Sequence, residues 1–424
     1  MNFKDLDLYF EILKTVLSFI TRLTVQKAQA IVHRHTYRLT SDPRNVIVVG
    51  GSFAGALLAQ RLCHTVPSGY RVILIEKHSH FNHAFGFPRN AVFSGREHHA
   101  FISYDNLTKG APDGIFQQVR DEVTDVTESH VNTAGGVLLP YEYLIIATGA
   151  AQPPPGRLIA DTKEDGIKEL KGYQQRIEKA DRVAIIGGGA VGVELVTEIK
   201  EKYPDKQVTL IHSRSHLLPR FGPKLHERVL ETLQKQDIEV LLGERPAYPI
   251  DAGQLVTETS LKLASGETRT WDLVIPCTGL RPRSELLVEY SLKSIASNGE
   301  ILVGPTLQVE NLPSSRKNIF ALGDVAQSGG PKQARAGLMQ AEIVISNLLQ
   351  LIKGGTAKDK YVPHFFENTL NLTLGKEHAV MWMQKGDYEW IKETKGPDED
   401  LNARQTRWQL NAKIEEDTGK KGSN

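Results

Sequence analysis

Cysteine is scarce in this 424-residue chain, which holds only Cys63 and Cys277, far apart in the sequence. A disulfide framework, a cysteine-based zinc site and a redox-active dithiol are therefore all excluded. No run of 18 apolar residues occurs, so we expect no transmembrane helix. Lys and Arg number 51 against 50 Asp and Glu, and this balance gives no global field that would attract nucleic acid.

Metal ligands are also missing in the patterns that a site requires. The 14 histidines include a local group at His78, His80 and His83, yet no HExxH motif or cysteine partner completes a tetrahedral set. We therefore expect no metal site. The length of 424 residues leaves room for about two or three domains, each with its own core.

What the sequence does contain is a repeated alternation of strands and helices. Short β-branched runs followed by helical stretches predict βαβ units and parallel sheets. Two such units open with a strand and a Gly-rich turn, so the predicted fold class is α/β with two Rossmann-type dinucleotide-binding domains. The first has strands at 45–49, 71–75 and 143–146 and a helix at 56–62; the second has strands at 182–186 and 207–211 and a helix at 193–200.

The first Gly-rich turn consists of Gly50, Gly51, Ser52, Phe53, Ala54 and Gly55. Gly50 permits the tight turn, and Gly55 lets the following helix lie close to the strand. Ser52 replaces the middle glycine of the motif, but serine is small and can donate to a phosphate. Glu76 ends the second strand, where a carboxylate can hold a ribose diol. The turn therefore predicts a dinucleotide site at the helix N-terminus.

The second turn has all three glycines of the motif, which are Gly187, Gly189 and Gly192. The strand after it ends in His212, Ser213 and Arg214, with no acid. A carboxylate there would bind a 2′-hydroxyl and repel a 2′-phosphate, so its absence favours use of NADPH at least as well as NADH. The alternative is that Arg214 simply faces solvent.

Three further segments extend the pattern. Residues 143–149 and 273–279 are near-copies, each a buried strand that ends in a Thr-Gly turn. Residues 318–324 form a strand that ends in a Gly-Asp pair, ahead of a helix predicted from Lys332 to Leu349. These are marks of the flavoproteins with two dinucleotide-binding domains. The residues expected at the cofactors are Ala147, Thr148, Gly149, Gly279 and Asp324. Asp324 taken alone could instead be a helix cap.

Within that superfamily the chain resembles the apoptosis-inducing-factor-like oxidoreductases, in the branch that contains the ferroptosis suppressor flavoprotein. It is more distantly similar to type II NADH dehydrogenases. The resemblance runs from about residue 44 to residue 410 and implies a pyridine nucleotide-disulfide reductase-like architecture. It rests on residues 48–55, 81–89, 208–213 and 374–380 and on the Gly-Asp pair.

The resemblance implies roles for individual residues. Asp324 should bind the ribityl chain of FAD, and Arg89 and the backbone of Val123 should touch FAD. Glu194 should face the nicotinamide, although it is alternatively a solvated helix acid. Lys332 should contact the flavin edge or the acceptor, although it is as readily a surface lysine.

Together these features predict an FAD-dependent enzyme that takes a hydride from NADPH or NADH and passes electrons to a quinone or similar small acceptor. Two alternatives remain: a tailoring oxidoreductase of a specialised small molecule, and a redox-sensing signalling flavoprotein. We expect a monomer or homodimer that is cytoplasmic or mitochondrial. The expected domains are 44–157 with 281–345 for FAD, 158–280 for NAD(P)H, and 346–424 as a C-terminal cap with a polar tail.

Residues 1–43 stand apart from these domains. From Leu6 to Val25 the periodicity predicts a helix with one narrow polar stripe and a broad apolar face. Such a helix either packs on the body of the protein or lies in a membrane interface, and the pattern favours both equally. The second alternative predicts peripheral contact with a membrane surface.

Overall fold

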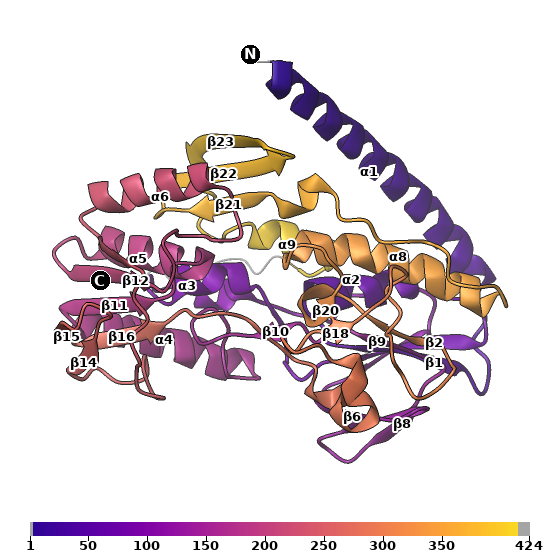
Figure 1. The fold of residues 1–424 in the computed structure, drawn as a ribbon. Coiled ribbons are helices and arrows are strands. Elements are labelled where there is room, and N and C mark those ends of the chain that lie inside the picture. The colour runs from indigo at the N-terminus through magenta and orange to yellow at the C-terminus, as the bar shows by residue number, and fades with distance from the viewer. Residues whose placement is uncertain (1–2, 414–424) are drawn as a thin grey trace, which may run out of the picture.

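The computed structural model describes residues 3–413, without the side chains of residues 3–7. Two parallel sheets lie side by side, each with helices packed against it (Figure 1). This arrangement confirms the predicted α/β fold class with two Rossmann-type units. No helix in the described part of the chain is both long enough and apolar enough to cross a membrane.

The first sheet has five parallel strands in the order β19-β9-β1-β2-β5. Its central strand β1 reads Arg-Asn-Val-Ile-Val-Val, and the continuous apolar run fits a strand covered on both faces. The strands are β1 (Arg44–Val49), β2 (Tyr70–Ile75), β5 (Phe116–Val119), β9 (Tyr143–Ile146) and β19 (Ile319–Ala321).

Helices α2 (Phe53–Leu62) and α8 (Ala334–Ile352) share one core with this sheet. They approach closely, because a Cβ on Gly337 would lie 2.9 Å from the Cβ of Ala54. A second core joins the sheet to an antiparallel meander. The meander consists of β6 (Val123–Val126), β7 (His130–Thr133) and β8 (Leu138–Pro140).

The second sheet has four parallel strands in the order β13-β12-β11-β16. The strands are β11 (Arg182–Ile186), β12 (Gln207–His212), β13 (Glu239–Leu242) and β16 (Leu273–Pro276). The helices of this unit are α4 (Lys163–Lys179), α5 (Ala190–Lys202) and α6 (Pro223–Lys235). A separate hairpin consists of β14 (Thr259–Lys262) and β15 (Thr268–Trp271). The two connections between the sheets meet as an antiparallel pair, β10 (Ala150–Ala151) with β17 (Arg281–Pro282).

The C-terminal part forms an antiparallel sheet followed by a short helix. Its elements are β21 (Leu370–Thr373), β22 (His378–Lys385), β23 (Tyr388–Lys395) and α9 (Ala403–Gln409). The sheet is anchored by Trp382, whose fully buried ring meets Phe221 edge-on at 5.1 Å between centroids. The part of the expected polar tail from residue 414 onward lies outside the described residues.

The remaining elements are short. The strands are β3 (Phe81–Asn82), β4 (Phe101–Ile102), β18 (Ile301–Leu302) and β20 (Ala326–Gln327), and the helices are α3 (Phe87–Asn90) and α7 (Val288–Ser291). The 3₁₀ turns are η1 (Ala84–Gly86), η2 (Glu97–Ala100), η3 (Glu285–Leu287), η4 (Leu292–Ser294), η5 (Gly323–Val325) and η6 (Phe365–Asn368).

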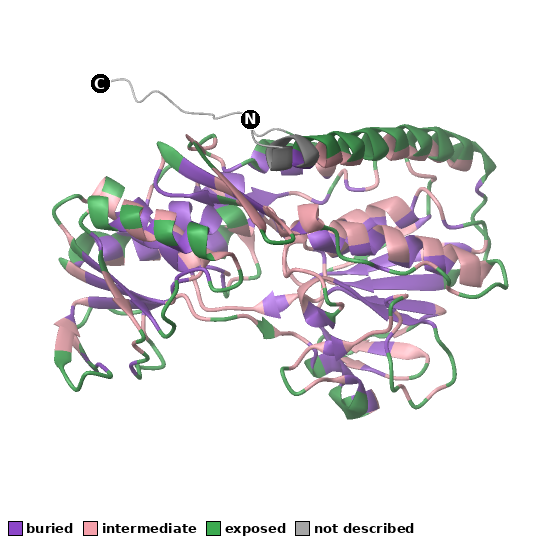
Figure 2. Cartoon of the chain, turned by 45° about the horizontal axis from the view of Figure 1, so that its top comes forward, coloured by how far each residue is buried: buried purple, intermediate pink, exposed green. Residues whose placement is uncertain are grey.

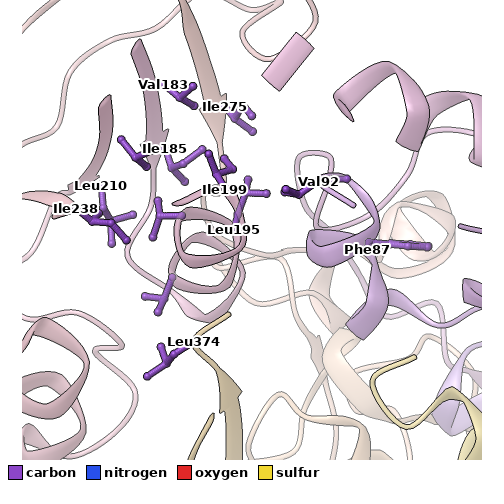
Figure 3. Packing of buried hydrophobic residues seen from close by; sticks show 14 of the residues in the cluster. Phe87, Val92, Val183, Ile185, Leu195, Ile199, Leu210, Ile238, Ile275 and Leu374 are labelled. Atoms are coloured by element: carbon purple, nitrogen blue, oxygen red, sulfur yellow. The ribbon is translucent and has the colours of Figure 1, made fainter. Parts of the chain in front are cut away.

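One apolar cluster joins three segments that are distant in sequence (Figure 3). Leu195 and Ile199 of α5 form its centre against the second sheet. Phe87 and Val92 reach it from the α3 region, and Leu374 reaches it from the C-terminal part. Each is at most 2% exposed. The cluster therefore holds the segments around α3, α5 and β21 in one packed unit.

Helix α1 (Phe3–Thr36) is longer than the predicted helix, which ended at Val25. The added turns contain Gln26, Lys27, Ala28, Gln29 and Ala30, all good helix formers. After the helix, the buried Tyr37 donates its hydroxyl to the Tyr70 carbonyl at 2.9 Å. This bond fixes the end of α1 to the first residue of β2 in the first sheet.

Candidate functional site

A single cleft of about 3030 Å³ is lined by both Gly-rich turns. Small-molecule pockets are ordinarily on the order of 300–1,000 Å³, so this cleft has room for two dinucleotides. Both turns follow the carboxyl ends of parallel strands, β1 and β11, where open α/β sheets bind ligands.

The first residue of each turn has to be glycine. Gly50 has φ +101° and Gly187 has φ +127°, in the region that other residues rarely adopt. A Cβ on Gly50 would lie 2.5 Å from the carbonyl oxygen of Ala147, and one on Gly187 would lie 2.3 Å from that of Cys277. Each turn therefore passes directly against the end of the neighbouring strand, and the two units repeat the same geometry.

The middle positions of the two turns, Ser52 and Gly189, are open to the cleft. Ser52 has φ −79° and ψ −165°, and Gly189 has φ −84° and ψ −176°, extended geometry that any residue can adopt. The serine is therefore accommodated without strain, and its side chain makes no capping hydrogen bond to α2. A Cβ on Gly189 would meet no atom within 4 Å. The free helix N-termini and this open space fit the phosphates of a dinucleotide.

Glu76 and His212 occupy the same place in their respective units. The backbone N–H of Gly51 donates to Glu76, and that of Gly188 donates to Nδ1 of His212 at 3.1 Å. Burial opposes ionisation of Glu76, but hydrogen bonds from His78 and Gly51 hold its pKa below the ordinary value. Burial lowers the pKa of His212, so this ring is neutral at physiological pH. One turn thus ends beside a carboxylate and the other beside an uncharged ring.

Arginines gather where the second unit lacks its acid. Arg214, Arg220 and Arg245 all line the cleft, and none forms an ion pair with a residue that the structure describes. Arg214 is exposed, as the alternative interpretation of it required, but it lies at the cleft margin. Three guanidinium groups that line the cleft without an ion pair to a described residue can attract an added phosphate.

Asp324 lines the cleft from the turn η5. It does not cap α8, because the N-cap of that helix is Gln333. Within residues 3–413 its carboxylate makes no hydrogen bond or ion pair, which leaves it available to a ligand. Arg157 lies near it, since burial lowers the Arg157 pKa while the charge of Asp324 opposes that shift.

Arg157 was not anticipated from the sequence. Its guanidinium lines the cleft and is paired with no described carboxylate. Such a group suits an anionic ligand, and FAD carries a pyrophosphate. The only local signal was its place directly after the Pro-rich segment 152–156, and this segment carries no distinctive spacing.

Glu194 and Lys332 both line the cleft, and both have protein partners. One oxygen of Glu194 accepts from the Thr373 hydroxyl at 3.0 Å and from the Thr373 backbone N–H at 3.3 Å. Burial raises the pKa of Glu194 to about 7, although the Thr373 hydrogen bonds act in the opposite direction. Lys332 donates to the Ala326 carbonyl at 2.6 Å and pairs with Glu300 at 2.9 Å.

The structure brings most of the remaining predicted residues together. The residues that line the same cleft are Phe53, Ala54, Val123, Ala147, Thr148, Gly149, Ser213 and Gly279. Three glycines of the turns do not line the cleft: Gly51, Gly55 and Gly192. A Cβ on Gly55 would be 1.9 Å from the Gly50 carbonyl oxygen, so this glycine allows helix packing and does not face the ligand space.

Arg89 lies outside the cleft lining and is 3% exposed. Its Nε donates to Glu198 Oε1 at 2.8 Å, and its Nη2 donates to the Gly375 carbonyl at 3.1 Å. A buried guanidinium requires such a carboxylate partner. Arg89 was expected to touch FAD. In the structure its partner is instead Glu198 on α5, where α3, α5 and the C-terminal part meet.

Comparisons with known proteins agree with this geometry. The family described as pyridine nucleotide-disulphide oxidoreductase matches residues 44–341. Fe-regulated protein 8 of Mycosarcoma maydis is 33% identical over 374 residues, which cover 82% of this chain and 91% of that protein. Ferroptosis suppressor protein 1 of Mus musculus is 30% identical over 346 residues, with coverage of 79% and 87%. The solved sulfide:quinone oxidoreductase of Aquifex aeolicus has a TM-score of 0.69 at 18% identity, with coverage of 87% and 91%.

The buried pair of Arg89 and Glu198 generates a stability prediction. Arg89→Met leaves the Glu198 carboxylate buried without its partner, so we expect the free energy of unfolding to fall by about 3–5 kcal/mol. The double variant Arg89→Met with Glu198→Met removes both charges and should recover most of that loss. Urea unfolding of the two variants and the wild type measures both effects.

Flavin content in the same preparations separates this role from direct cofactor binding. If Arg89 acts only through Glu198, the double variant keeps its FAD. Equal loss of FAD in the single and double variants would contradict the structural role and assign Arg89 to the cofactor.

Proposed function

The chain belongs to the pyridine nucleotide-disulphide oxidoreductase family, and from this premise we propose that it transfers electrons from NADPH or NADH through FAD to a quinone-type acceptor. It is an NAD(P)H-dependent flavoprotein oxidoreductase, and the predicted resemblance to the ferroptosis suppressor branch is confirmed. FAD would supply the redox chemistry, taking a hydride from the nicotinamide and giving an electron pair to the acceptor. The residues of the cleft bind and orient the partners.

The observation that carries the proposal is a cleft with two dinucleotide turns and no cysteine pair. Cys277 lines the cleft with no second cysteine beside it, and burial raises the pKa of its thiol to about 12. Cys63 is fully buried at the end of α2. Thiol exchange requires a thiolate and a second sulfur, so neither cysteine serves as a relay. The acceptor must therefore take electrons from the flavin directly, as a quinone does.

An aromatic group in the cleft supports a planar acceptor. The ring of Phe53 lies 4.9 Å from that of Phe85 and 6.0 Å from that of His83, between centroids. All three residues line the cleft, and Phe85 is 53% exposed. Burial lowers the pKa of His83 to about 4, so the ring is neutral. An uncharged, partly open aromatic surface favours an apolar ring over a charged substrate.

Purified protein tests this function directly. With NADPH supplied, we expect steady turnover of a short-chain, water-soluble quinone that exceeds the rate with oxygen alone. Asp324→Ala removes a carboxylate that would bind the cofactor, and its flavin occupancy should fall by about tenfold or more. If NADPH reduces the flavin in a single turnover and no quinone reoxidises it, the result would instead support the redox-sensing alternative. Turnover of only one specialised compound would support the tailoring alternative.

Coenzyme choice follows from the arginines at the second turn. The uncharged His212 and the unpaired Arg214, Arg220 and Arg245 should let NADPH bind at least as well as NADH. Ser213→Asp places a negative charge beside the 2′-phosphate and should raise the KM for NADPH by about tenfold or more, with little change for NADH. Ser213→Asn, which is similar in size and uncharged, is the control. Equal losses for both coenzymes would show that this turn does not contact the ribose.

Glu194 should control the pH dependence of flavin reduction. The nicotinamide ring becomes positive when it loses hydride, and a carboxylate facing it stabilises that charge. Glu194 is protonated below pH 7 and ionised above it, so the reduction rate should rise with pH through a midpoint near 7. Stopped-flow reduction of the wild type and of Glu194→Gln checks this. A profile that keeps its midpoint near 7 in the Gln variant would assign the titration to another group.

A further inference from the structure

Helix α1 is exposed along the side that faces away from the protein (Figure 2), and large apolar residues are among the exposed ones. The outward residues recur at helical spacing and form what we call the outer stripe. It consists of Phe10, Leu13, Leu17, Ile20 and Ile31, which are 66%, 55%, 56%, 53% and 64% exposed. A helix on the surface of a globular protein ordinarily buries such a stripe against the core. This helix leaves it uncovered over most of its length.

The opposite side of α1 meets the body through polar contacts and through Leu8, which is 2% exposed. Gln26 Nε2 donates to Glu342 Oε2 on α8 at 2.9 Å, and Arg22 Nη2 lies 3.7 Å from the Met339 sulfur. Farther along, His33 Nε2 lies 2.7 Å from the Val66 carbonyl oxygen. These contacts determine which side of the helix meets the protein. The contacts between α1 and the body therefore fix the outward direction of the stripe.

The charges on α1 distinguish between the binding partners that could cover the outer stripe. Among residues 8–36 the exposed charged side chains, Lys14, Lys27 and Arg34, are all basic. The single acid in that range, Glu11, is half-buried. It lines the cleft, as the exposed Lys14 and Lys27 also do. Over residues 8–36, a second copy of the helix would bring basic groups to face basic groups, with no exposed acid between them. An anionic lipid surface offers the complementary charge together with an apolar layer for the stripe.

We propose that the outer stripe of α1 docks in the interface of an anionic lipid surface. The helix would lie in the plane of the interface, with Lys14, Lys27 and Arg34 among the headgroups. Its inner side lines the cleft at Glu11, Thr15 and Arg22, so the margin of the cleft beneath α1 would open beside the lipid. A lipid-soluble acceptor would reach the flavin from there. This last step rests on the proposed function, whereas docking does not.

Sedimentation of the full-length holoenzyme with vesicles tests the docking. We expect binding to phosphatidylcholine vesicles that contain phosphatidylserine, weaker binding without phosphatidylserine, and loss of binding in high salt. Leu17→Glu with Ile20→Glu should weaken binding by at least about tenfold, since two apolar side chains no longer enter the interface. Leu138→Glu with Leu255→Glu is the matched control, because both leucines are 57% exposed and neither lies on α1.

Three outcomes would overturn the inference. The wild-type protein could stay in the supernatant, or the control variant could lose as much vesicle binding as the α1 variant. Light scattering could also show a dimer for the wild type and a monomer for the α1 variant, with no vesicle binding by either. Leu17 and Ile20 do not line the cleft, so the α1 variant should keep wild-type turnover of a water-soluble quinone. If no preparation reduces quinone while the wild type still binds vesicles, the proposed function fails and the docking stands.

Discussion

The close approach of each Gly-rich turn to its own helix is the constraint on which the cleft depends. A Cβ on Gly192 would lie 1.9 Å from the Gly187 carbonyl oxygen, the same separation as in the first turn. Only this contact lets α2 and α5 begin directly at the carboxyl edges of their sheets. Their unsatisfied N–H groups and positive dipole ends then face one shared space. Two anionic cofactors can meet there because both turns are built in the same way.

Much of this could be predicted because its causes are local. The strand β1, its turn and α2 are contiguous, and the same order recurs from β11 to α5. A buried parallel strand needs a continuous apolar run, and the turn after it needs glycine, so both leave direct marks in the sequence. The lack of an acid at the end of β12 was also visible in the sequence.

What the sequence did not reveal depends on contacts between distant segments. Arg89 and Glu198 are 109 positions apart, and no spacing rule links them. The family resemblance implied a cofactor contact for Arg89. In the structure its guanidinium is buried between α3 and α5 and pairs with the carboxylate of Glu198. Arg220 and Arg245 likewise join Arg214 only because the loops after β12 and β13 turn toward the same cleft. Long-range geometry, which no local pattern encodes, decides these pairings.

Helix α1 shows a different limit. Its periodicity predicted an amphipathic helix correctly, but a protein core and a lipid interface satisfy an apolar face equally well. The choice depends on the polar side, where Gln26 meets Glu342 and His33 meets the Val66 carbonyl. These groups would lose hydrogen bonds if the helix rotated to bury its apolar stripe, and unsatisfied polar groups are costly. The polar contacts therefore set the direction of the apolar face.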